Sequence, residues 1–156
     1  MSTIAPRARG RRAALALVLT GVCLGTAGCS QAYSASGRLA QAASDASAQT
    51  QTGALTLRLS ATHRLPSPAT DTALSDAIDK LGQDDSSLTS ADVSGGLETA
   101  RTRILSKVRT GEDLLARARH LTEAGAGQAT TDALVRQLQV TAKQLAALQK
   151  QLQGSG

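Results

Sequence analysis

The sequence predicts an all-α protein, a small up-down bundle of three to four helices that follows an N-terminal signal or anchor segment. Apolar residues recur at steps of three and four along four stretches of the chain, which is the spacing of an amphipathic helix. Short connections rich in Pro, Gly and Ser separate these stretches. The apolar residues after the N-terminal segment are nearly all Leu and Ala, which let helices approach closely but form a thin core. With 156 residues, the chain holds at most one small domain.

The composition excludes several kinds of partner. The chain is 41% apolar and 19% charged, which is too apolar for a disordered tail. It contains one Tyr, Tyr33, and neither Phe nor Trp. Stacking on nucleobases and an aromatic cage for a ligand cation both need aromatic rings. We therefore expect no nucleic-acid partner.

The N-terminus has the features of an export signal. Residues 1–12 contain no acid and four arginines, which are Arg7, Arg9, Arg11 and Arg12. An apolar stretch follows directly at residues 13–24. This order is that of the charged n-region and short h-region of a secretory signal, and the stretch is shorter than the roughly 20 residues that span a bilayer. The adjacent Arg11 and Arg12 also fit a permissive twin-arginine pattern, so the general secretory and twin-arginine routes both stay open.

The h-region ends in Gly25-Thr26-Ala27-Gly28-Cys29. Small residues before a Cys at the end of a signal resemble the lipobox of bacterial lipoproteins. The resemblance implies cleavage between Gly28 and Cys29, a diacylglyceryl group on the Cys29 sulfur and, usually, an acylated new amino terminus. Ala27 and Gly28 match the small positions, whereas Thr26 stands where family members most often have Leu. The other interpretations of Cys29 are an incidental Cys near the end of an ordinary signal, or part of an uncleaved anchor helix.

The lipobox interpretation also decides what the cysteines do. Cys23 lies in the h-region and would leave with it, so the mature chain would hold Cys29 alone. No disulfide, Cys-based metal site or Cys nucleophile would remain. A diacylglyceryl group supplies the two chains that stable anchoring generally takes, so the folded part need not touch lipid. The predicted domains are a signal peptide at 1–28, the lipidated Cys and a polar tether at 29–37, and the bundle at 38–156.

The first two helices are expected at residues 38–63 and 68–83. The apolar stripe of the first is Leu39, Ala43, Ala46, Thr50, Gly53 and Leu57, widened by Leu55 and Leu59. Pro66 stops it, and Ser67 is suited to cap the second helix with Pro68 at its first position. The apolar face of the second helix is Ala73, Leu74, Ala77, Ile78 and Leu81. The polar residues 83–96 are expected to form the longest loop, with a short turn near 88–93 where Thr89 and Asp92 have capping-box spacing.

The last two helices are expected at residues 96–123 and 130–153. The stripe of the third keeps its phase through Gly111, which favours one helix over two that split at Thr110. The fourth carries a heptad seam of Leu134, Leu138, Thr141, Leu145, Leu148 and Leu152. Three heptads are barely enough for an independent coiled coil. We expect this seam to pack within the bundle, with a partner chain as the alternative.

The mature chain offers no constellation of catalytic or metal-ligating residues. His63 is expected at the end of the first helix, where a cation suits the helix dipole. His120 and Glu123 are spaced i, i+3, but a carboxylate-bridged metal bundle needs Glu followed by His, twice, and two further Glu residues. The acidic residues Asp71, Asp76, Asp79, Asp84, Asp85 and Asp92 lack the ligand spacing of a calcium loop and are expected on a solvated surface. We therefore expect no enzyme, no metal and no cofactor.

Charge is segregated along the mature chain. Residues 67–98 carry seven acids and one Lys, and residues 99–156 carry nine basic residues and four acids. If the second and third helices lie side by side, these charges complement one another. If they point apart, the basic surface of the last two helices would face anionic lipid heads or a cell-wall polymer. The formal charge of +5 comes mostly from the signal, because removing its four arginines leaves 13 basic residues against 12 acids.

Rich in Ala, Leu and Thr and poor in Lys, the mature sequence resembles small exported lipoproteins of high-GC Gram-positive bacteria. The resemblance implies attachment to the cell membrane at its extracytoplasmic face. We expect a non-catalytic interaction or scaffolding module that has an envelope protein as partner. The alternative is a lipoprotein that binds a small or lipidic ligand between its helices. Neither the ligand, the partner nor the oligomeric state follows from the sequence.

Overall fold

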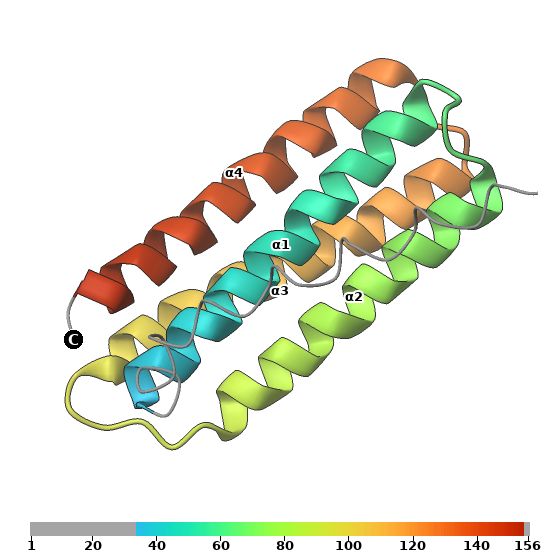
Figure 1. Ribbon diagram of the computed structural model, residues 1–156. Coiled ribbons are helices and arrows are strands. Elements are labelled where there is room, and N and C mark those ends of the chain that lie inside the picture. The colour runs from blue at the N-terminus through green and yellow to red at the C-terminus, as the bar shows by residue number, and fades with distance from the viewer. Residues whose placement is uncertain (1–33, 155–156) are drawn as a thin grey trace, which may run out of the picture.

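The computed structural model describes residues 34–154, which form four helices in sequence (Figure 1). They are α1 Ala35–Ala61, α2 Ser67–Ser90, α3 Leu97–Glu123 and α4 Gln128–Gly154. Each helix runs antiparallel to the next, and the described residues form no strand. The predicted all-α up-down bundle is therefore confirmed, with four helices. Gly28, Cys29 and the rest of the predicted signal lie outside the described residues.

The four helices surround one core, but they differ in how many of the other helices each one packs against. α1 packs against each of the other three, whereas no Cα atom of α2 lies within 8 Å of one in α4 among residues 34–154. α4 packs along α1, and the Ser47 hydroxyl donates a hydrogen bond of 3.0 Å to the Ala142 carbonyl of α4. The small residues Ser47, Ala54 and Ala142 lie at this contact, and the size of the side chains at a contact sets the distance between two helix axes. α4 therefore lies next to α1 and diagonally across the bundle from α2 (Figure 1).

The predicted apolar stripes make up the core. Residues of the α1 stripe from Leu39 to Leu57 are buried. The α4 seam is also buried except for Leu148, which is partly buried and packs against the core, so the seam serves the bundle as predicted. Leu55 is an error in the prediction, because its side chain is 56% exposed. At 100° per residue, Leu55 lies about 140° around the helix from Thr50, too far to join the stripe.

The middle of the bundle is closed by one residue from each helix. A Cβ atom built on Gly111 of α3 would lie 3.1 Å from Thr50 Oγ1, 3.4 Å from Leu81 Cδ1 and 4.0 Å from Thr141 Cγ2. These three neighbours belong to α1, α2 and α4. The absence of a side chain at Gly111 therefore lets the other helices close over α3. α3 continues through this position as one helix, as predicted, and does not split at Thr110.

α1 and α3 end in the same way. The chain turns through a left-handed residue, His63 with φ 54° after α1 and Gly125 with φ 65° after α3. Arg64 N–H then donates to Leu59 O at 2.8 Å, and Ala126 N–H donates to Leu121 O at 2.9 Å. These are the bonds of Schellman motifs. His63 therefore forms the turn that follows α1, rather than the end of the helix as predicted.

α2 differs most from the prediction. It begins at Ser67 with Pro66 as its N-cap, so Ser67 is the first helical residue and not the cap. It runs to Ser90, through half of the expected loop at 83–96. Leu88, seven residues after Leu81, is only 2% exposed, and burial of this side chain holds the polar last two turns against the core. The connection to α3 is left to residues 91–96, where Gly95 and Gly96 have positive φ.

Candidate functional site

The acidic helix α2 is paired with α3. α2 carries five Asp and one Lys. Arg119 Nε of α3 lies 2.6 Å from Asp71 Oδ1, and Arg109 Nε lies 2.7 Å from Asp85 Oδ1. The acidic and basic parts of the chain therefore complement one another between adjacent helices, which is the first of the two arrangements expected from the sequence. Asp71 and Asp85 are thus used in helix pairing, and no group of three or more possible metal ligands occurs among the acids of the described residues.

Asp84 is the acid with a perturbed environment. It is half-buried in α2, and the negative charge of Asp45 on α1 acts on it. Burial, and to a smaller extent the negative charge of Asp45, raise the pKa of Asp84 from its ordinary 3.8 to about 6. No basic side chain forms an ion pair with Asp84 among the described residues. The carboxylates of Asp45 on α1 and Asp84 on α2 therefore repel one another when both are ionised, and this repulsion depends on pH.

The two histidines are placed where neither forms a reactive site. His63 forms the turn after α1. His120 is 81% exposed near the end of α3, with its Nδ1 3.7 Å from Glu123 Oε2. The same Glu123 lies 3.5 Å from Arg119 Nε. Residues 34–154 contain no group of three or more His, Cys, Asp or Glu that could hold a metal ion.

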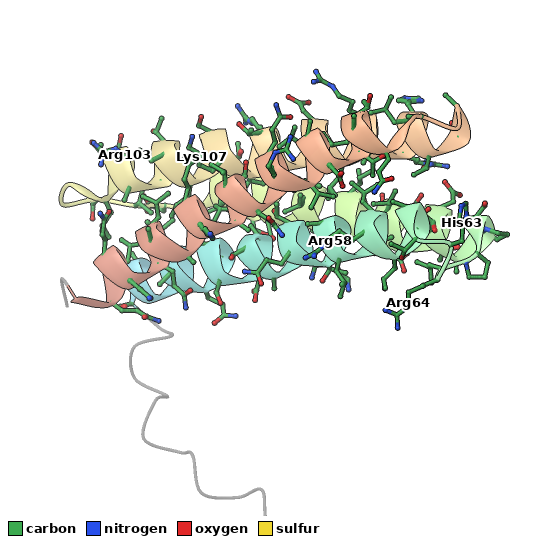
Figure 2. The ribbon with its side chains drawn as sticks, turned by 90° about the horizontal axis from the view of Figure 1, so that it is seen from above. Arg58, His63, Arg64, Arg103 and Lys107 are labelled. Carbon is green, nitrogen blue, oxygen red and sulfur yellow. The ribbon has the colours of Figure 1, made fainter. Side chains whose placement is uncertain are left out.

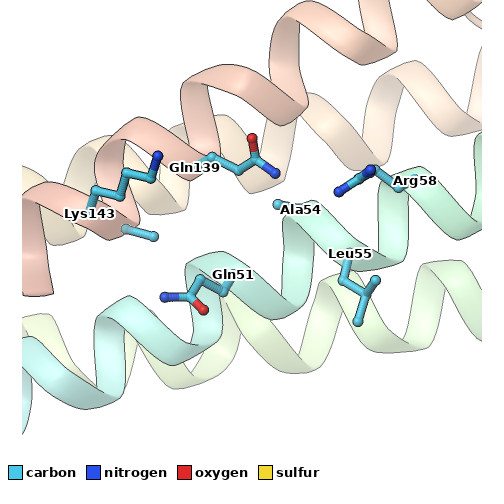
Figure 3. A pocket seen from close by; sticks show the side chains of 7 residues that line it. Gln51, Ala54, Leu55, Arg58, Gln139 and Lys143 are labelled. Carbon is cyan, nitrogen blue, oxygen red and sulfur yellow. The ribbon is translucent and has the colours of Figure 1, made fainter.

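A shallow groove runs between α1 and α4. Its volume is about 370 Å³. Ala54 and Ala142 lie at the base, while Gln51, Arg58, Gln139 and Lys143 surround it and Leu55 stands at its edge. Figure 3 shows Arg58 of α1 and Gln139 of α4 directed toward one another, with Gln51 and Lys143 at the other end of the groove. Neither Arg58 nor Lys143 forms an ion pair within the part of the chain that the structure describes. The groove therefore offers two unpaired cations and two amides over a small apolar base.

A second groove lies on the opposite face, between α2 and α3. It is wide and open, with a volume of about 710 Å³. Asp79 and Glu112 line it together with the half-buried Ile78, Gly82 and several polar residues. The two grooves thus differ in charge, with Arg58 and Lys143 beside the one between α1 and α4 and Asp79 and Glu112 beside the one between α2 and α3.

The groove between α1 and α4 belongs to a larger surface that we call the basic face. Its cations on α4 are Arg136, Lys143 and Lys150, which recur every seven residues and so lie in one row. No acid occurs in α4 after Asp132. In Figure 2, Arg58 of α1 lies on one side of α4, and Arg103 and Lys107 of α3 lie on the other. Leu55 lines the groove and is 56% exposed, and Val140, four residues after Arg136 and three before Lys143 on α4, is 54% exposed.

Sequence reasoning found only part of this face. The basic character of the third and fourth helices was evident, but Arg58 comes from the first helix and is brought to the same groove as Lys143 by packing alone. The sequence pattern places Leu55 beside the core stripe, whereas the structure exposes it. The one feature of the sequence that indicates exposure of Leu55 is its position off the main stripe of the helix.

Comparisons with protein-family models, with curated proteins and with solved structures find no match to this chain. Among the described helices, none combines the length and apolar character needed to cross a membrane.

Proposed function

We propose that this protein is an extracytoplasmic lipoprotein, held at the cell membrane by a lipid on Cys29, whose helical bundle is a non-catalytic interaction module. The observation that carries the proposal is the order of features in the first 29 residues: arginines, an apolar stretch, small residues and a Cys. Cleavage between Gly28 and Cys29 would leave Cys29 as the first residue of the mature chain.

The position of the bundle along the chain supports this proposal. α1 begins at Ala35, six residues after Cys29. A chain reaches at most about 3.6 Å per residue, so six residues reach about 20 Å at full extension. A lipid on Cys29 would therefore hold the start of α1 close to the membrane. The bundle would then meet its partners near the membrane surface.

The use of the titratable side chains supports a non-catalytic role. Asp71 and Asp85 pair with arginines, and His63 forms a turn. A general base or nucleophile needs a hydrogen-bonded partner that orients it beside a substrate site. The polar residues of the groove between α1 and α4 are amides and cations, which suit binding of an anionic surface rather than proton transfer at neutral pH.

A ligand held between the helices is the alternative function. It calls for a large cavity lined by Leu. The bundle centre is instead filled where Gly111 meets Thr50, Leu81 and Thr141, and the two grooves described above open to solvent. These observations give more support to binding at the surface.

Membrane fractionation of the full-length protein tests the anchor. Wild type should sediment with membranes and be extracted only by detergent, whereas Cys29→Ser should accumulate as an unprocessed precursor or be released. Cys23→Ser is the matched control, because Cys23 lies in the h-region and its loss should leave processing unchanged. A wild-type chain that is soluble, or a Cys29→Ser chain that behaves as wild type, would contradict the proposal.

The interaction role has a separate test. Crosslinking of the native protein in intact cells should yield defined adducts with envelope proteins. If no protein is captured and a lipid copurifies in fixed proportion to the chain, the ligand-binding alternative replaces the interaction module.

A further inference from the structure

The basic face combines three properties in one place. It holds a row of cations, it lacks acids after Asp132 on α4, and it presents the exposed side chains Leu55 and Val140. Two arginines outside this face, Arg109 and Arg119, form ion pairs with acids between α2 and α3. Cations that are left unpaired around exposed apolar side chains are typical of surfaces that bind anionic lipid.

The most acidic helix lies away from this face, although Asp132 of α4 stands in the cation row, four residues before Arg136. α2, with five Asp and one Lys, is diagonally across the bundle from α4 and has no Cα atom within 8 Å of one in α4 among the described residues. The molecule is therefore electrically polarised across its short dimension. An anionic surface would attract the α4 side and repel the α2 side. This charge distribution would therefore determine the orientation of the bundle on the surface as well as its affinity for it.

We propose that the basic face docks on an anionic lipid surface, so that the bundle lies with the axes of α1 and α4 along the membrane. Arg58, Lys143 and their neighbours would contact lipid phosphates, and Leu55 and Val140 would enter the headgroup region. Long basic side chains suit this arrangement, because their aliphatic stems lie along apolar surface while the charge stays in water. The proposal rests on the proposed function for its cellular setting, since the anchor on Cys29 would keep the bundle at the membrane.

A second copy of the chain is the competing occupant of the basic face. The groove between α2 and α3 presents Asp79 and Glu112, which could pair with Arg58 and Lys143 of a neighbour. That groove has only the half-buried Ile78 to offer to Leu55 and Val140. A lipid surface satisfies both the charge and the apolar side chains, so we favour it.

Binding to vesicles tests the proposal without the lipid anchor. The core residues lie between Leu39 and Leu152, so a chain that begins at residue 30 contains the folded unit and lacks Cys29. This chain should sediment with vesicles that contain phosphatidylglycerol and should stay in solution with phosphatidylcholine vesicles. Raising the salt concentration should release it.

A matched pair of double variants tests the location of the contact. Arg58→Gln/Lys143→Gln should lower the partition constant roughly 30-fold, about fivefold for each cation lost near the surface. Arg64→Gln/Lys80→Gln removes the same charge from exposed positions off the basic face and should change partition by about twofold or less. Equal losses in the two variants would overturn the proposal, because they would mean that only net charge matters.

The orientation has its own readout. A fluorophore at Ala147→Cys, on the outward side of α4 seven residues from Val140, should be quenched by nitroxides on lipid headgroups. The same fluorophore at Asp79→Cys on α2 should not be quenched. Equal quenching at the two positions would contradict the proposed orientation.

The remaining outcomes are also decisive. Failure of the wild-type chain to bind anionic vesicles overturns the proposal, and so does self-association without vesicles that Arg58→Gln/Lys143→Gln abolishes, since the partner would then be a second copy. Vesicle binding by the chain from residue 30 does not depend on lipidation. An unmodified Cys29 in cells would therefore refute the anchor alone, whereas loss of vesicle binding would refute docking alone.

Discussion

Gly53 lets α1 and α3 pack against one another. A Cβ atom at this position would overlap Leu115 Cδ2, and Leu115 is fully buried, so it has little room to move. Gly53→Ala is therefore expected to destabilise the bundle by about 1–3 kcal/mol through overpacking, despite the better helix propensity of Ala. Gly82→Ala in α2, where the added Cβ meets nothing within 4 Å, should instead stabilise by about 0.5–1 kcal/mol.

Urea unfolding of both variants measures the contrast. The midpoint should fall for Gly53→Ala and rise for Gly82→Ala. A rise for both would mean that Leu115 rearranges freely and that the contact between α1 and α3 is loose.

His63 occupies a backbone conformation that glycine adopts without strain. Its φ of 54° lies in the left-handed region, which costs a residue with a Cβ about 1 kcal/mol. His63→Gly should therefore raise the free energy of unfolding by up to about 1 kcal/mol, measured by denaturant unfolding. His63→Val, which is β-branched, should lower it. A loss of stability in His63→Gly would show that the imidazole makes a contribution beyond the turn.

Asp84 makes stability depend on pH. Its pKa in the folded protein, about 6, exceeds the ordinary 3.8, so folding favours the protonated carboxyl. The stabilising effect is complete below pH 4 and is lost as the pH rises through 6. Asp84→Asn should therefore stabilise the bundle at pH 7.5 by about 1 kcal/mol, a figure reduced for the half-exposed side chain.

The same variant should show no gain at pH 4. Unfolding by urea at both pH values measures the difference, with Asp76→Asn as a control that removes an exposed carboxylate from the same helix. An equal gain from Asp84→Asn at both pH values would show that repulsion from Asp45 and burial are not its cause.

At the scale of the helices, periodicity predicted four elements because each one buries a stripe of Leu and Ala. It failed at the end of α2, where Ser86, Ser87 and Ser90 suggest a loop. In the structure the hydroxyls of Ser86 and Ser90 donate back to carbonyls four residues earlier, at 2.9 and 3.0 Å. These bonds satisfy the hydroxyls within the helix. One buried side chain, Leu88, outweighs the weak local propensity, and only packing reveals it.

Leu88 therefore tests the length of α2. Leu88→Ala should destabilise the bundle by about 2–4 kcal/mol and speed amide hydrogen exchange over residues 84–90. Leu55→Ala removes the same side chain from the exposed surface of α1 and should change stability by about 0.5 kcal/mol or less. Similar effects of the two substitutions would contradict the extended α2.

At the scale of the whole molecule, the anchor can be predicted from the sequence alone, whereas the basic face cannot. The anchor is a local motif, since Gly28 and Cys29 follow an apolar stretch directly. The basic face includes Arg58 and Lys143, which are far apart in the chain and line one groove only because α4 packs along α1. No periodicity within a single helix predicts such an arrangement. The pairing of α2 with α3 was foreseen as one of two arrangements, and packing chose between them.

The mass of the mature N-terminal peptide, isolated from membranes of cells that make the full-length protein, tests the central claim most directly. The proposed lipoprotein should yield a peptide that begins at Cys29 and carries the added mass of a diacylglyceryl group, with or without an acyl chain on its amino terminus. A peptide that begins at any other residue, or an unmodified Cys29, would contradict the claim.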